Sequence, residues 1–116
     1  MDFGKWIYEA VKDGVPDDAA AFCFNLYESD DDNKFDVQLI ASPSFDENDS
    51  DWACEECFTT GEELYTVTAD NWEGALETVG RMIEKLVSEK ELPVCFNDRR
   101  IAYGFVDGDL YIIRKT

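Results

Sequence analysis

The fold is decided by residues 20–42, AAFCFNLYESDDDNKFDVQLIAS, where two alternating segments flank a polar run. Apolar side chains occupy every second position of both segments: Phe22, Phe24 and Leu26 in the first, and Phe35, Val37, Leu39 and Ala41 in the second. A period of two predicts β-strands over residues 20–28 and 34–42. The polar residues 29–33 between them predict a hairpin loop, which carries three consecutive aspartates at its tip.

Two helices are predicted outside this hairpin. Apolar residues recur at helical spacing between residues 2 and 13, and Gly14 and Pro16 end that segment. A longer helix is predicted over about residues 71–90, with a capping-box-like start at Asp70 and Glu73 and a stop at Pro93. We interpret the apolar stripe along this helix as a core-facing surface. The stripe consists of Trp72, Ala75, Leu76, Val79, Met82, Ile83, Leu86 and Val87.

A second hairpin is predicted at the end of the chain, because Asp107-Gly108 suits a two-residue turn between two alternating segments. That turn would place Tyr111 opposite Gly104, where the aromatic ring would cover a strand position without a side chain. It would also gather five apolar side chains on one face: Ile101, Tyr103, Phe105, Leu110 and Ile112.

The order of these elements predicts an α+β domain. Its antiparallel sheet would contain four to six strands, with an N-terminal helix and with the long helix placed before the C-terminal hairpin. Residues 64–68 predict a further strand, and residues 52–60 are a candidate for a short one. No linker or repeat divides the sequence, so we expect a single domain over residues 1–116.

The charge of the chain is large and unevenly distributed. The 116 residues include 27 acidic, 10 basic and no histidine residues, which gives a formal net charge of −17. Residues 1–70 carry 19 acidic and 3 basic residues, whereas residues 71–116 carry 8 and 7. Because 45% of the residues are hydrophobic, we expect a folded core despite this charge. So acidic a chain disfavours direct binding to nucleic-acid phosphates, and its natural complement is a basic protein partner.

The sequence also predicts a compartment. No stretch reaches the roughly 20 apolar residues of a membrane span, and the first residues lack a basic region followed by an apolar run. We therefore expect a cytoplasmic protein that does not engage a membrane. Its four cysteines, Cys23, Cys54, Cys57 and Cys95, should then be thiols rather than disulfides. The sequence leaves the oligomeric state open.

The motifs that could carry chemistry are incomplete. Cys54 and Cys57 form a C-x-x-C motif, but no second pair and no histidine complete a zinc site, and the intervening glutamates disfavour a reactive thiolate. The aspartate-rich runs lack the glycine and glutamate that a calcium-binding EF-hand loop needs at its sixth and twelfth positions. The chain has no histidine base and no phosphate-binding glycine loop. We therefore predict a protein that is not an enzyme and has no metal or cofactor.

One acidic stretch with interleaved aromatic residues is the candidate partner-binding site. It could be a solvated loop held by its aromatic residues, or a surface whose carboxylates match a basic protein. The concentration of acid in residues 1–70 favours the second interpretation. The predicted site consists of Asp46, Glu47, Asp49, Asp51, Trp52, Glu55, Glu56 and Phe58.

Three stretches resemble the small immunity proteins of bacterial polymorphic toxin and contact-dependent inhibition systems: residues 49–54 (DSDWAC), the helix that Trp72 leads, and residues 101–110 (IAYGFVDGDL). The resemblance covers the latter two-thirds of the chain and implies an antidote that binds and blocks a cognate toxin domain, often a basic nuclease. It transfers no binding residue. The alternatives are an acidic adaptor or nucleic-acid mimic that binds basic proteins, and a cysteine-based metal or redox protein.

Overall fold

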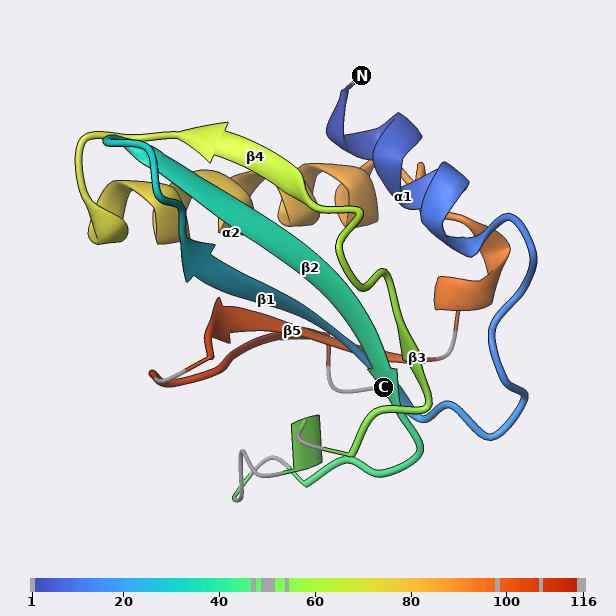
Figure 1. Ribbon diagram of the computed structural model, residues 1–116. Coiled ribbons are helices and arrows are strands. Elements are labelled where there is room, and N and C mark those ends of the chain that lie inside the picture. The colour runs from blue at the N-terminus through green and yellow to red at the C-terminus, as the bar shows by residue number, and fades with distance from the viewer. Residues whose placement is uncertain are drawn as a thin grey trace.

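The computed structural model describes residues 2–46, 48, 52–53, 55–97, 99–106 and 108–114 (Figure 1). The predicted α+β class is confirmed, and the described residues form two α-helices and a six-stranded sheet. The elements in chain order are α1 (Phe3–Val11), β1 (Ala21–Glu28), β2 (Lys34–Ser42), β3 (Phe58–Thr59), β4 (Tyr65–Thr68), α2 (Trp72–Ser88), the short 3₁₀ helix η2 (Val94–Phe96), β5 (Arg100–Phe105) and β6 (Tyr111–Arg114).

The sheet is mostly antiparallel, with the strand order β3-β2-β1-β5-β6. The short strands β3 and β4 share one edge of β2, on which β3 pairs with Ile40 and Ala41, and β4 pairs with residues 34–37. The predicted hairpin of β1 and β2 is confirmed, with Glu28 opposite Phe35 next to the loop.

The prediction of an antiparallel sheet is wrong for one pair of strands, because β1 and β5 run parallel from the pair Ala21–Arg100 to the pair Leu26–Phe105. Strand β2 occupies one edge of β1, so β5 takes the other edge after the chain has passed through α2. Residues 21–26 are all buried, as is typical of a central strand that is covered on both faces. Sequence alternation indicates which face a side chain occupies, but it carries no information on strand direction.

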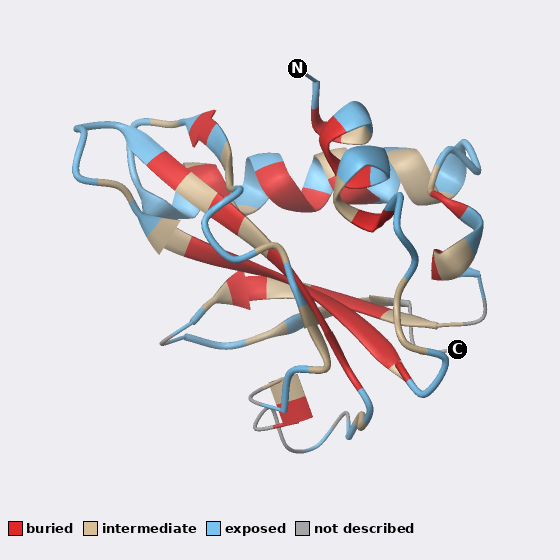
Figure 2. Ribbon diagram, turned by 45° about the vertical axis from the view of Figure 1, so that its right-hand side comes forward, coloured by how far each residue is buried: buried red, intermediate tan, exposed pale blue. Residues whose placement is uncertain are grey.

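The two faces of the sheet have different covers (Figure 2). We call the face under α1 and α2 the helix face, and the opposite one the second face. The main core lies on the helix face, where helix residues such as Ile7, Val79 and Ile83 pack against Phe22, Phe24 and other alternating residues of the strands. A smaller cluster on the second face consists of Ala21, Cys23, Ile40, Trp52 and Ala102, with Phe45, Ala53, Leu110 and Ile112 packed against it.

The long helix α2 differs from its prediction at both ends. Its N-cap is Asn71 rather than Asp70, and the Asn71 side chain accepts a hydrogen bond from the backbone N–H of Gly74. The helix ends at Ser88, well before Pro93. Its apolar stripe packs on the core as predicted, except that Trp72 is 52% exposed. Trp72 is the first residue of α2 and lies where the helix only begins to cross the sheet, so the core covers it only in part.

The predicted register of the C-terminal hairpin is wrong by one residue. Tyr111 lies opposite Tyr103 and not opposite Gly104, so Leu110 and Ile112 face the second-face cluster. Five residues, 106–110, connect β5 and β6 in place of the predicted two-residue turn. The backbone carbonyl of Asp109 lies so close to Gly104 that a Cβ atom at that position would clash with it.

Candidate partner-binding site

Apart from Phe58, which begins β3, the predicted site residues belong to residues 43–57. These residues connect β2 to β3, and we call them the acidic segment. Its Trp52 is only 5% exposed and packs in the second-face cluster with side chains of β1, β2 and β5. The Ser42 hydroxyl donates a hydrogen bond to the Trp52 carbonyl at 2.9 Å, and the Cys57 N–H donates to the Ala41 carbonyl at 2.8 Å. The acidic segment is therefore fastened to the second face at its middle and at its end.

Contacts of the Phe45 ring strengthen this attachment. The rings of Phe45 and Trp52 lie 5.1 Å apart at an interplanar angle of 55°. The guanidinium carbon of Arg100, from β5, lies 5.4 Å from the centre of the Phe45 ring, which is a cation–π distance. Arg100 and Phe45 are far apart in the chain, and the pairing of β5 with β1 brings Arg100 to this end of the sheet.

The structure separates the predicted site residues into two groups. Asp46, Glu55 and Glu56 are exposed, whereas Trp52 is buried and Phe58 is half-buried against the helix-face core. Glu47, Asp49 and Asp51 lie outside the described residues. In this conformation the described carboxylates are available to a partner. Trp52 and Phe58 hold the acidic segment on the sheet, which is the anchoring function that the solvated-loop interpretation assigns to them.

The negative charge of Glu56 acts on a polar side chain of β1, that of Tyr27. Burial raises the pKa of the Tyr27 phenol, and the negative charge of Glu56 raises it further. The Tyr27 hydroxyl donates a hydrogen bond to the Gln38 side-chain carbonyl at 3.0 Å. On the neighbouring strand β4, Thr66 donates to the Asp36 carboxylate at 2.8 Å. Hydrogen bonds between neighbouring strands therefore orient the polar side chains of Tyr27, Asp36 and Thr66.

The described cysteines have environments that suppress thiol chemistry. Cys23 is buried and donates to the Asn25 side-chain oxygen at 3.2 Å, and burial raises its pKa to about 12. Burial also raises the pKa values of Cys57 and Cys95, although the positive charge of Arg99 opposes the shift at both. A raised pKa lowers the fraction of the nucleophilic thiolate at neutral pH. Cys54 lies outside the described residues, and the residues described contain no cluster with the composition of a metal site.

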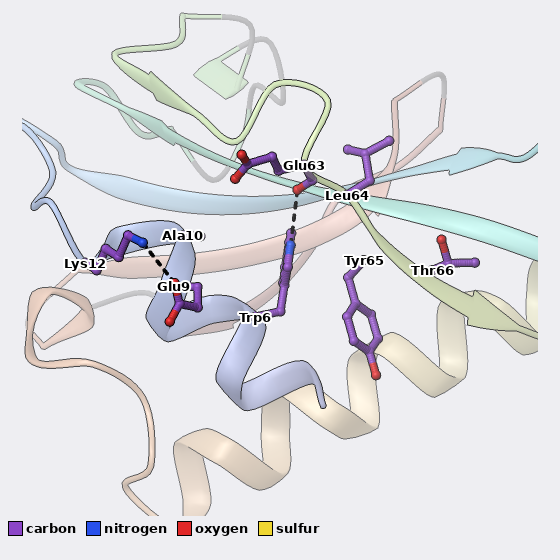
Figure 3. Close-up of a pocket in the computed structure, with 8 residues that line it drawn as sticks. All are labelled: Trp6, Glu9, Ala10, Lys12, Glu63, Leu64, Tyr65 and Thr66. Carbon is purple, nitrogen blue, oxygen red and sulfur yellow. Dashed lines mark hydrogen bonds and ion pairs between the residues drawn. The ribbon is translucent and has the colours of Figure 1, made fainter. Parts of the chain in front are cut away.

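A separate cavity of about 590 Å³ lies between α1 and the chain that leads into β4 (Figure 3). The indole N–H of Trp6 points across it and donates to the Glu63 carbonyl at 3.1 Å. On its α1 side, Lys12 and Glu9 form an ion pair at 3.1 Å, and the hydrogen bond with Glu9 is the main cause of the raised pKa of Lys12. The lining combines the carboxylates of Glu9 and Glu63 and the ammonium group of Lys12 with the aromatic rings of Trp6 and Tyr65.

No protein-family model, no curated protein and no solved structure matches this chain. Within the described residues, neither α-helix has the length and apolar character needed to cross a membrane.

Proposed function

We propose that this chain is a non-catalytic binding protein that neutralises a basic protein partner by stoichiometric binding. In this proposal the partner is a cognate toxin domain, with a nuclease as the leading case, as the resemblance to the immunity proteins of polymorphic toxin systems implies. In this proposal the acidic segment is the contact surface, and Asp46, Glu55 and Glu56 are the described residues that meet the partner.

The attachment of the acidic segment to the sheet carries the proposal. A free acidic loop would lose much conformational entropy on binding, at about 1–2 kcal/mol for each residue whose backbone becomes fixed. Trp52 and the hydrogen bond from Ser42 hold the middle of the segment before any partner arrives. Preorganisation of this kind lowers the free-energy cost of association.

The mechanism that follows is occlusion. A nuclease binds phosphates in a basic groove, and carboxylates held on a folded surface can occupy such a groove in place of the phosphates. The excess negative charge would also steer the approach of the partner and raise the association rate about 10–10³-fold at low salt. Added salt should reduce this gain, because it screens charges that are exposed to solvent.

Growth rescue tests the assignment to the immunity class. The C-terminal domain of a large secreted protein encoded immediately upstream of this chain should arrest growth when expressed in bacteria. Co-expression of this chain should restore growth, and the two purified proteins should form a 1:1 complex. If that domain is toxic, yet growth is not restored and no complex forms, the assignment is wrong. Binding to many unrelated basic proteins with similar affinity would instead indicate the adaptor or nucleic-acid mimic.

Charge reversal tests the surface. The triple variant Asp46→Lys, Glu55→Lys and Glu56→Lys should weaken the complex by at least about tenfold and flatten its salt dependence. The matched control is Glu84→Lys, Glu89→Lys and Glu91→Lys, which makes the same change of net charge at exposed positions in and after α2. Equal losses of affinity in the two variants would mean that overall charge, and not the acidic segment, determines binding.

A further inference from the structure

A second cavity, of about 310 Å³, lies at the start of α2 on the helix face and at the Glu28 end of β1. The acidic segment packs near the opposite end of β1, around Ala21 and Cys23, and on the other face of the sheet. We call this cavity the aromatic pocket. Its lining includes Trp72, Phe105, Tyr111, Leu76, Glu28 and Asp109.

The aromatic pocket contains the most exposed tryptophan of the protein. Trp72 is 52% exposed, whereas Trp6 and Trp52 are 7% and 5% exposed. Trp72 meets Phe105 edge to face, with ring centroids 6.3 Å apart at an interplanar angle of 83°. Tyr111 is 46% exposed, and its ring lies 5.6 Å from that of Tyr103. Each of these two large aromatic side chains therefore has one ring neighbour and a substantial area open to the pocket.

The charged groups of the lining, Glu28 and Asp109, are both carboxylates. Neither forms an ion pair with any other residue that the structure describes. Aromatic faces attract cations through the ring quadrupole, and Trp attracts them most strongly. Aromatic rings and carboxylates around one cavity are the combination of side chains that favours an organic cation.

The size of the pocket limits the ligand. Sites for small molecules have volumes of about 300–1,000 Å³, so this cavity is at the lower limit and suits one large side chain. We propose that the aromatic pocket receives an arginine side chain of the basic protein partner. A planar guanidinium can stack on Trp72 or Tyr111 while its N–H groups reach a carboxylate in bidentate geometry. The ammonium group of lysine lacks the planar face and the fork of donors.

This inference rests on the proposed function in one respect, namely that the partner is a basic protein. It adds a second contact point at the other end of β1, which would use the neutral C-terminal part of the chain as well as the acidic part. Exposed carboxylates alone contribute little to affinity. The aromatic rings should therefore supply most of the binding energy, and Glu28 and Asp109 the preference for a cation.

A peptide titration tests the pocket without the toxin. The probe is the blocked peptide Ac-Gly-Ala-Arg-Ala-Gly-NH₂, with citrulline in place of arginine as the neutral isostere and with lysine as the second comparison. The arginine peptide should shift the indole N–H resonance of Trp72, with a dissociation constant on the order of 1–10 mM. The indole resonances of the buried Trp6 and Trp52 should not move. The citrulline peptide should cause no shift, and the lysine peptide should bind several-fold more weakly.

The variants separate charge from packing. Glu28→Gln with Asp109→Asn should weaken arginine binding by about tenfold while the fold is kept. Trp72→Ala should abolish binding, followed by the backbone amide resonances of Leu76 and Tyr111, and Tyr8→Ala, at an equally exposed aromatic residue on α1, is the unaffected control. A Trp72 resonance that stays fixed at about 20 mM arginine peptide, or that moves equally with citrulline, would overturn the inference. Equal affinity for the lysine peptide would overturn the choice of arginine.

The affinity for the toxin domain is the second test of the aromatic pocket. Trp72→Ala and the Glu28→Gln, Asp109→Asn variant should each lower affinity for that domain by about tenfold, and Tyr8→Ala should leave it unchanged. An unchanged affinity in both pocket variants would overturn the inference even where growth is rescued. A failure of growth rescue would instead count against the proposed function, and the peptide result would be unaffected.

Discussion

Lys90 follows α2 in a backbone conformation that glycine adopts more readily than any other residue. Its φ is 55°, in the left-handed region. The Lys90 N–H donates to the Val87 carbonyl at 3.2 Å, and the Glu91 N–H donates to the Leu86 carbonyl at 2.9 Å. These two hydrogen bonds form a Schellman motif, in which glycine usually occupies the position of Lys90.

Lys90→Gly should therefore stabilise the protein. Removing the Cβ relieves a strain of about 1–2 kcal/mol. The greater freedom of glycine in the unfolded chain offsets about 0.5–1 kcal/mol of this gain. The net increase in the free energy of unfolding should be about 0.5–1 kcal/mol, measured by urea denaturation. Lys90→Ala is the control, because it removes the charge but keeps the Cβ. If the alanine variant is stabilised as much as the glycine variant, the strain is not the cause.

At the scale of the element, Gly80 explains how closely α2 approaches β5. A Cβ atom at Gly80 would lie 2.7 Å from Cζ of Tyr103, well inside contact distance. Gly80 is buried in the middle of the helix, where alanine would otherwise be favoured by about 1 kcal/mol. The absence of a side chain at Gly80 therefore leaves the space that the Tyr103 ring occupies.

Gly80→Ala should destabilise the protein in spite of the higher helix propensity of alanine. Overpacking costs about 1–3 kcal/mol, so the net loss in the free energy of unfolding should be about 1–2 kcal/mol. Gly74→Ala is the matched control in the same helix, because its Cβ would make only ordinary contacts of 3.4 Å and beyond. That variant should be neutral or slightly stabilised. A stable Gly80→Ala protein would show that the Tyr103 ring moves aside freely.

Most helices and strands could be predicted, because the sequence patterns that indicate them lie within each element. The alternation through β1 and β2 and the helical spacing around Val79 both determine which side of an element is buried. The parallel pairing of β1 with β5 depends instead on the path of the chain through α2, and no local pattern encodes that path. The predicted register of β6 was also wrong. Leu110 and Ile112 pack on the second face, and this packing prevailed over the preference of Asp107-Gly108 for a tight turn.

At the scale of the molecule, the acidic segment could be located from the sequence, but the contacts that hold it could not. The order of the residues fixes where acidic side chains concentrate along the chain. The partners of Trp52 come from β1, β2 and β5, and only the folded sheet brings them together. The aromatic pocket was missed for the same reason. Trp72 has the spacing of a core residue, and its exposure depends on where α2 begins relative to the sheet.

The remaining property of the whole molecule is its uncompensated charge. The described residues form three ion pairs, all of them exposed and between close neighbours in the sequence: Lys12–Glu9, Lys34–Asp31 and Arg81–Glu77. Such pairs contribute little to stability. The net charge of −17 is confined to a molecule with principal extents of 38 × 30 × 26 Å. Repulsion among these negative charges should therefore destabilise the compact state.

Added salt should consequently raise the thermal midpoint. The Debye length falls from about 30 Å at 0.01 M salt, comparable to the molecule, to about 10 Å at 0.1 M. The rise should be equal in sodium chloride and choline chloride, because screening does not depend on the cation, whereas a specific cation site would distinguish the two salts. Calorimetry in both salts makes this measurement.

The hairpin tip between β1 and β2 should contribute most to this effect, because Asp30, Asp31 and Asp32 are adjacent and exposed there. Asp30→Asn with Asp32→Asn keeps Asp31, which lies 3.9 Å from Lys34, and removes two negative charges. This variant should be stabilised by up to about 1 kcal/mol at 0.01 M salt, and the gain should largely vanish at 0.5 M. Glu84→Gln with Glu89→Gln makes the same change of charge within α2 and at its C-cap, in a part of the chain where basic residues are more frequent. Equal gains in both variants would mean that total charge, and not crowding at the tip, sets the stability.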